Sequence, residues 1–336
     1  MEACLRISLK LFSKSTLFAI ATSAIAVAFP IILSAQNLIS NPPFEVKLKG
    51  EGQIRAITSR PKIAIGGYNV ASYIEGKASA YSGGMLSGGS GARATMKFTQ
   101  SGITPELLSE LATAGYQDLL AQLSAAGIEV IKLEDVKAHP NAKNGDIGNY
   151  DRNISSLGSD MIIRGPQGIG GTGYQAPNFP FYNANGLAKI SSENDASLLF
   201  NNVVFNFVDM QSSGNSHLAR NAHVGGTAKF ILEPRVSSSS MIFSRDGRFA
   251  DGLYVFYANR VVRNEAFANM QNMRNTDNSL GVALSSAFGV GMSNNSRRDN
   301  LIVVDPVQYK QLALSMMRGY NAELVAQIVA AKANQR

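Results

Sequence analysis

Hydrophobic positions divide the chain into one long apolar run near its start and many shorter stretches with strand or helix periodicity. The strand-like stretches are rich in β-branched and aromatic residues and are bounded by Gly, Pro or Asn, which is typical of β-strands. We expect strands near residues 62–74, 92–98, 128–133, 160–164, 202–209, 226–232 and 301–305.

Residues 104–126 carry the clearest helix pattern. Thr104 is suited to cap the helix and Pro105 to its first position, while spaced leucines give it an apolar face. Gly127 ends the helix, and the strand at 128–133 follows directly. Two more helices are expected at 306–317 and 322–333. The pattern predicts an α/β or α+β fold, with a mixed β-sheet covered by a few helices.

Two stretches are too rich in glycine for regular structure. One covers residues 82–91 and the other begins at Gly165 and ends at Gly186. We therefore expect residues 36–336 to form a single domain with an irregular insertion at about 165–200.

The long apolar run has the form of a secretory signal peptide. Three basic residues precede it, the run covers 16–33, and Ser34-Ala35 supplies a cleavage site after Pro30. We expect residues 1–35 to be a signal peptide and Gln36 to be the mature N-terminus. A retained membrane anchor is the alternative, because 18 residues approach the length of a spanning helix.

Cysteine use points to a bacterial envelope. The only cysteine, Cys4, lies inside the expected signal peptide, so the mature chain would be disulfide-free. Thiolate catalysis, cysteine-ligated metals and lipidation after the apolar run are excluded with it. An exported protein of this size without disulfides is typical of a Gram-negative periplasm, and a periplasmic or secreted location is expected.

The charge balance adds a second indication. The formal net charge is +7, and removal of three basic residues and Glu2 with the signal peptide would leave +5. This excess suits contact with an anionic envelope surface. Basic runs interleaved with aromatic residues are absent from the sequence, which argues against a nucleic-acid partner.

Glycine and histidine offer weak candidate sites. The cluster Gly168, Gly170, Gly171 and Gly173 lacks the Lys-Ser/Thr of a phosphate loop, and prolines follow it instead of a helix. His217 and His223 are expected across a hairpin turn without a third ligand. His139 precedes a proline in a polar loop, where we expect it to be solvated. We assign no metal ligand and no cofactor-binding residue.

Asp209 and Asp305 are the acidic residues of most interest, because each follows an apolar strand, where α/β active sites commonly lie. Such aspartates also cap the turn or helix that follows, and Asp305-Pro306 has the form of a helix N-terminus. Capping is the favoured interpretation, so no catalytic residue is assigned. The other acid/base candidates are Glu129, Glu134, Asp135, Asp146, Asp151, Asp246 and Asp251.

The order of several segments resembles one group of envelope proteins. The first segment is the strand Lys62-Ile63-Ala64-Ile65. The second is the helix at 107–126, which continues through Gly127 into the strand Ile128-Glu129-Val130, and two further strands follow at 158–165 and 208–214. This order is similar to that of the curli-secretion lipoprotein family and its relatives, the penicillin-binding-protein activator lipoproteins and the TolB N-terminal domain. The resemblance implies an α/β fold in the cell envelope. The chain departs from it by lacking a lipidation cysteine and by its long insertion at 165–200.

These observations favour an exported, non-enzymatic periplasmic protein that assists envelope or surface-structure assembly through protein–protein contacts. Its partner would be an envelope protein or a second copy of the chain. The alternative is an enzyme or a binding module that acts on an envelope polysaccharide or lipid. The enzyme would use Asp209, Asp305 or a loop carboxylate, and the binding module would use a Tyr/Phe-rich lid at 174–182. An open sheet edge would favour the first hypothesis, and ionisable groups converging on one pocket would favour the second.

Overall fold

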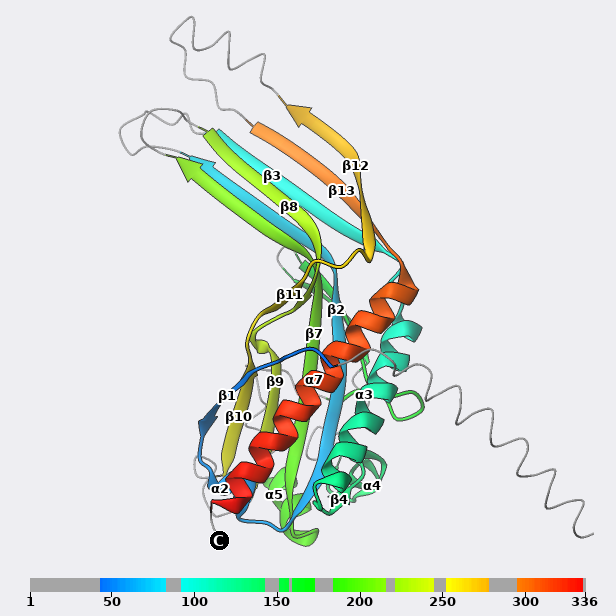
Figure 1. The fold of residues 1–336 in the computed structure, drawn as a ribbon, viewed down its shortest axis with the longest axis vertical. Coiled ribbons are helices and arrows are strands. Elements are labelled where there is room, and N and C mark those ends of the chain that lie inside the picture. Colours follow the sequence, from blue (N-terminus) through cyan, green and yellow to red (C-terminus); the bar gives the residue numbers. More distant parts are fainter. Residues whose placement is uncertain are drawn as a thin grey trace, which may run out of the picture. The chain divides into compact units, whose positions relative to one another are not determined.

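A computed structural model describes residues 43–82, 92–142, 151–156, 159–172, 184–215, 221–244, 252–277 and 295–334. They belong to one compact unit that begins at Pro43. The described strands form a mixed sheet with helices on both of its faces (Figure 1), which confirms the expected fold class.

Two long strands form the centre of the sheet. β2 (Lys62–Ser82) and β7 (Ala196–Asn215) run parallel from the pair Lys62–Ala196 to the pair Ser72–Phe205. The other edge of β2 pairs with β4 (Val130–Ile131) and β6 (Ser159–Arg164), and β6 pairs with β5 (Arg152–Ser156). From β7 the sheet continues through β9 (Arg235–Phe243) and β10 (Leu253–Ala258) to β1 (Leu48–Gly52).

The two central strands separate beyond Ser72 and Phe205. β2 turns to pair with β3 (Ala92–Ser101), which pairs with β13 (Asn295–Val304) and then β12 (Ala268–Asp277). We call this set, with β2 counted from Glu75, the four-strand layer. β7 pairs instead with β8 (Asn221–Leu232), whose end pairs with β11 (Val261–Arg263). The β7–β8 hairpin packs on the four-strand layer, because the Phe98 ring lies directly over Gly226.

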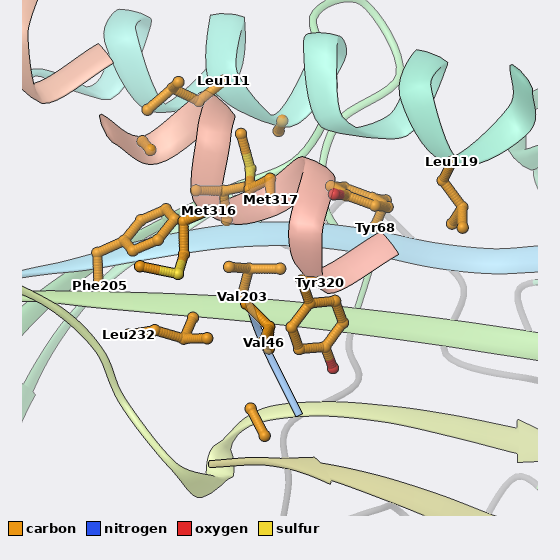
Figure 2. Packing of buried hydrophobic residues seen from close by; sticks show 14 of the residues in the cluster. Val46, Tyr68, Leu111, Leu119, Val203, Phe205, Leu232, Met316, Met317 and Tyr320 are labelled. Atoms are coloured by element: carbon orange, nitrogen blue, oxygen red, sulfur yellow. The ribbon is translucent and has the colours of Figure 1, made fainter. Parts of the chain in front are cut away.

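α3 (Pro105–Ala125) and α7 (Pro306–Ala333) cover one face of the central strands and pack on each other. Figure 2 shows the resulting core, in which side chains from both helices and from β2 and β7 point into one cluster. Its members are fully or almost fully buried and include Tyr68, Leu111, Leu119, Val203, Phe205, Met316, Met317 and Tyr320. Burial of this face against α7 is a main source of stability, since hydrophobic burial is the dominant favourable term in folding.

The opposite face of the same strands is covered by α4 (Leu133–Ala138) and α5 (Ala184–Glu193). Strand alternation divides the side chains between the two faces. Ile63 and Leu199 pack toward α3 and α7, whereas Ala64 and Leu198 belong to the cluster that includes residues of α4 and α5. Burial on both faces explains the apolar runs in the first halves of β2 and β7, such as Ile63-Ala64-Ile65 and Leu198-Leu199-Phe200.

The residues before β1 form a strap across α7. The amide of Phe44 donates a hydrogen bond to the carbonyl oxygen of Ser315 at 3.2 Å, and Val46 is buried in the core. The guanidinium of Arg263 lies 4.1 Å from the centre of the Phe44 ring. Residues 43–47, which we call the strap, therefore hold the C-terminal helix against the sheet. α2 (Arg55–Thr58) follows β1.

Several sequence-based expectations were wrong in detail. The two C-terminal helices are one continuous helix, α7, because Gly319 does not break it but lets the strap pass close to it. The strand at 128–133 is reduced to Val130–Ile131, since α4 begins at Leu133. Part of the expected irregular insertion is regular, because α5 buries Leu187 and Ile190 and is followed by the start of β7.

Other expectations fall outside the described residues. They are the signal peptide and its cleavage site, most of the glycine-rich segment at 82–91, residues 173–183 of the insertion, His217, Asp146, Asp246 and Asp251.

Candidate functional site

Asp209 lies within β7 and not at a strand end, so the expectation that it caps a turn is wrong. Its carboxylate lies 2.7 Å from Arg260 Nη2 and 3.5 Å from Lys229 Nζ, and its side chain is only 16% exposed. The Arg260 guanidinium, helped by Lys229, holds the pKa of Asp209 below its usual value. A carboxylate kept ionised between two cations is suited to an ion pair and poorly suited to proton donation.

Asp305 is the N-cap of α7, as the sequence predicted. Its Oδ1 accepts hydrogen bonds from the amides of Val307 at 2.9 Å and Gln308 at 3.2 Å, with Pro306 at the first helical position. These bonds satisfy amides that have no partner within the helix. The geometry is that of a structural cap.

The histidines give no ligand set. His139 is mostly covered, contrary to the expectation that it is solvated, because its Nε2 lies 3.0 Å from Glu193 Oε2 and its Nδ1 accepts the Asn141 amide. His223 occupies a backbone position in β8 opposite Ser213. Within the described ranges, no three His, Cys, Asp or Glu residues gather closely enough to hold a metal ion.

The glycine cluster at 168–171 is built around a cation and not around a phosphate. Lys137 Nζ donates to the carbonyl oxygens of Ile169, Gly170 and Gly171 at 2.6, 3.0 and 3.0 Å. Asp151 Oδ1 accepts the amides of Gly165 and Gly171. Partial burial lowers the pKa of Lys137. Because a phosphate loop directs amides toward its ligand, these inward carbonyls support the structural interpretation.

Two of the remaining acids also have structural partners. Glu129 pairs with Lys62 at 2.7 Å, and Glu134 accepts a hydrogen bond from the Tyr116 hydroxyl at 2.7 Å. The same hydroxyl accepts the Leu133 amide at 2.9 Å, and burial raises the pKa of Tyr116. These contacts fix the start of α4 against α3.

A buried polar network under α7 was not predicted from the sequence. Asn321 accepts from the Tyr68 hydroxyl at 3.3 Å and donates to the Gly115 carbonyl and to Asp118, both at 2.9 Å. Beside it, Ser240 Oγ lies 2.6 Å from Asn201 Oδ1 and 2.9 Å from the Tyr320 hydroxyl. Burial raises the pKa of Tyr68. The sequence offers one indication of this network, which is that polar residues occur at positions where the pattern predicts buried apolar ones. Which of them pair could not be predicted, because the partners come from segments far apart in the chain.

A cavity of about 570 Å³ is lined by residues on or beside β1 and β10, but its charged side chains have nearby partners. Lys49 pairs with Glu51 at 2.7 Å, and Arg260 pairs with Asp209. Of the ionisable groups with shifted pKa values, Tyr68 and Tyr116 are buried in the core with their ring centres 6.3 Å apart, whereas Lys137 is held by loop carbonyls and Asp209 by two cations. The described residues thus give the enzyme hypothesis no converging set of groups.

The outer edge of β12 is one of several edges of the described sheet. β12 ends the strand order and pairs with β13 alone among the described strands. Met270 is 40% exposed and Met273 64% exposed, and residues 268–273 carry no charge. Edge strands are commonly protected by charge, proline or bulges, and here only a bulge between Asn272 and Arg274 interrupts the pairing. The edge from 268 to 272 is a candidate interaction surface.

The described helices include none with the length and apolarity needed to cross a membrane. Comparison with protein-family models, with curated proteins and with solved structures gave no match to this chain.

Proposed function

We propose that this is an exported, non-enzymatic protein of the cell envelope that assists the assembly of an envelope or surface structure through protein–protein contact. The observation that carries the proposal is the uncharged edge of β12, with Met270 and Met273 exposed beside it. An unpaired strand offers backbone donors and acceptors to an added strand, and neighbouring side chains give specificity.

The contacts of the acidic candidates support this interpretation over the enzyme hypothesis. Asp209 and Asp305 are held by ion pairs and by helix amides. The N-terminal sequence pattern and the resemblance to envelope proteins support the location, and the partner would be an envelope protein or a second copy of the chain.

The test adds charge to the edge. Asn269→Lys combined with Gln271→Lys places two cations on β12, which should oppose strand addition without disturbing the core, since both positions are exposed. Gln53→Lys combined with Gln308→Lys adds the same charge at two exposed positions away from β12 and is the matched control.

Crosslinking and pull-down from intact cells, with sedimentation of the purified protein, then compare the three chains. We expect the edge variant to capture at least about ten-fold less partner, or to self-associate at least about ten-fold more weakly, in line with the loss of a hot-spot contact. The control should behave as wild type. Undiminished capture by the edge variant would refute the role of β12. Turnover of an envelope polysaccharide by the purified wild-type protein would replace the proposal with the enzyme hypothesis.

A further inference from the structure

The four-strand layer carries a net positive charge. Its strand segments, 75–82, 92–101, 268–277 and 295–304, contain six Lys or Arg residues and three Asp or Glu residues. The facing hairpin segments, 206–215 and 221–232, contain one residue of each sign, Lys229 and Asp209. One layer of this two-layer region is therefore basic and the other is neutral.

Strand alternation places cations on the outward face of the four-strand layer. Ala80, Met96 and Phe98 are buried on the inner face, against the β7–β8 hairpin. Lys77 and Ser79 are exposed between them, and the side chains of Lys97 and Arg297 are 35% and 58% exposed. The described outward side chains are thus charged or hydroxyl-bearing, with Glu75 and Asp299 among the cations.

One cross-strand pair on this face is unfavourable by itself. Lys77 and Lys97 are direct partners in the antiparallel register of β2 and β3, which puts their side chains on one face about 5 Å apart at Cβ. Like charges in this position destabilise a sheet. Lys97 also contacts Glu75 at 2.7 Å, and Arg297 contacts Asp299 at 3.2 Å, so acids offset part of the repulsion.

We propose that the outward face of the four-strand layer binds a membrane surface of anionic lipid headgroups. A phosphate between Lys77 and Lys97 would relieve their repulsion, and the hydroxyls of Ser79 and Thr95 lie in the neighbouring register row to donate to its oxygens. Glu75 and Asp160 are register partners where β2 leaves the central sheet, so the binding surface lies beyond them, toward the end of the layer.

The side-chain types on the face favour a lipid surface over a nucleic acid. Single-stranded nucleic acids bind in grooves where bases stack on aromatic side chains. The described outward side chains at 75, 77, 79, 95, 97, 99, 297 and 299 are charged or hydroxyl-bearing and include no aromatic ring on which a base could stack. The inference concerns the outward face of the layer and not the outer edge of β12, and it stands without the proposed assembly function.

Vesicle co-sedimentation of the exported chain, as isolated from cells, tests the inference. The probe is large vesicles of phosphatidylglycerol and phosphatidylcholine in a 1:3 ratio, compared with pure phosphatidylcholine. The variant is Lys77→Gln with Arg297→Gln, and Lys47→Gln with Lys49→Gln is the matched control, because those lysines are 76% and 80% exposed on or beside β1. Both variants remove the same charge.

We expect the wild-type chain to prefer the anionic vesicles and to lose this preference in 0.5 M salt. Each removed cation should weaken binding about five-fold, so the face variant should bind about twenty-five-fold more weakly and the control within about two-fold of wild type. Ser79→Glu, which adds an anion to the same face without removing a cation, should weaken binding in the same direction, and thermal melts of all variants verify folding.

Three results would overturn the inference. Equal binding to neutral and anionic vesicles would show apolar insertion, and equal losses in the face variant and the control would show a diffuse charge effect. Tighter binding to a single-stranded oligonucleotide than to the anionic vesicles would assign the face to a nucleic acid.

Discussion

Gly319 of α7 lies where the carbonyl oxygen of Phe44 crosses the helix, so closely that a side-chain carbon at this position would overlap that oxygen. The amide of Phe44 donates to Ser315 one turn earlier in α7. The helix therefore has a glycine in its interior because the strap needs its surface. Helix propensity alone would disfavour that glycine by about 1 kcal/mol relative to alanine.

Gly319→Ala should destabilise the protein by about 1–3 kcal/mol, because the added methyl group must displace the strap. The free energy of unfolding from urea melts checks this. Ala322→Gly, at an exposed position of the same helix, is the control and should cost about 1 kcal/mol through propensity alone. A more stable Gly319→Ala protein would mean that the strap does not pack on α7.

Leu111→Ala should cost about 2–5 kcal/mol, because Leu111 is fully buried between α3 and the sheet and its loss leaves a cavity. Thr104→Ala should cost only about 1 kcal/mol, because it removes one cap bond, the 3.2 Å contact from the Leu107 amide to Thr104 Oγ1. Urea melts of both variants provide the comparison. Similar costs would show that the leucine face of α3 is misassigned.

Asp209→Asn should lower the free energy of unfolding by about 1 kcal/mol at neutral pH, or the melting temperature by about 2–3 °C, because it removes the charge that pairs with Arg260 and Lys229. The pKa of Asp209 is lowered in the folded state. Its contribution is therefore fully present above about pH 4 and is lost as the pH falls through the lower folded-state pKa.

Melts of wild type and Asp209→Asn from pH 7 to pH 2 check this dependence, and the two curves should converge in acid. A difference that persists unchanged at pH 2 would contradict the ion-pair account. A variant that melts as wild type but fails to complement a deletion strain would return Asp209 to the list of catalytic candidates.

Asp305→Ala should cost about 0.5–2 kcal/mol, because it leaves the amides of Val307 and Gln308 without their cap. Asp305→Ser keeps a capping oxygen and should recover most of the loss. Thermal melts measure both variants, and complementation should follow stability in each. Loss of function in Asp305→Ser without loss of stability would indicate a role for the carboxylate beyond capping.

Local patterns predicted the parts of the fold that depend on local physics. Thr104 and Asp305 cap their helices as expected, since capping involves residues within one turn. The strands at 62–74 and 202–209 were located by their apolar runs, but their lengths were not. β2 and β7 continue as far as Ser82 and Asn215 because β3 and β8 pair with them. The last residues of both strands are largely polar, and their sequence gives no local indication of this pairing.

The candidate surfaces were beyond the reach of sequence patterns for the same reason. Asp209 was placed at a strand end because the apolar run stops there, whereas β7 continues through polar residues. β12 has a mixture of Asn, Gln and Met with no strand period, and its strand form comes from pairing with β13. The basic face exists only when β2, β3 and β13 are brought together from distant parts of the chain.

The strap also limits when the protein can fold during its synthesis. Residues 43–47 are made early, yet they pack on a helix that begins at Pro306, and β3 pairs with a strand that begins at Asn295. A nascent chain that ends before α7 lacks the helix that covers the larger apolar cluster of the core. Such long-range contacts slow folding, because distant segments must meet before their contacts stabilise anything. Folding is consequently completed only after α7 has been synthesised, and a chain truncated before residue 306 should not fold.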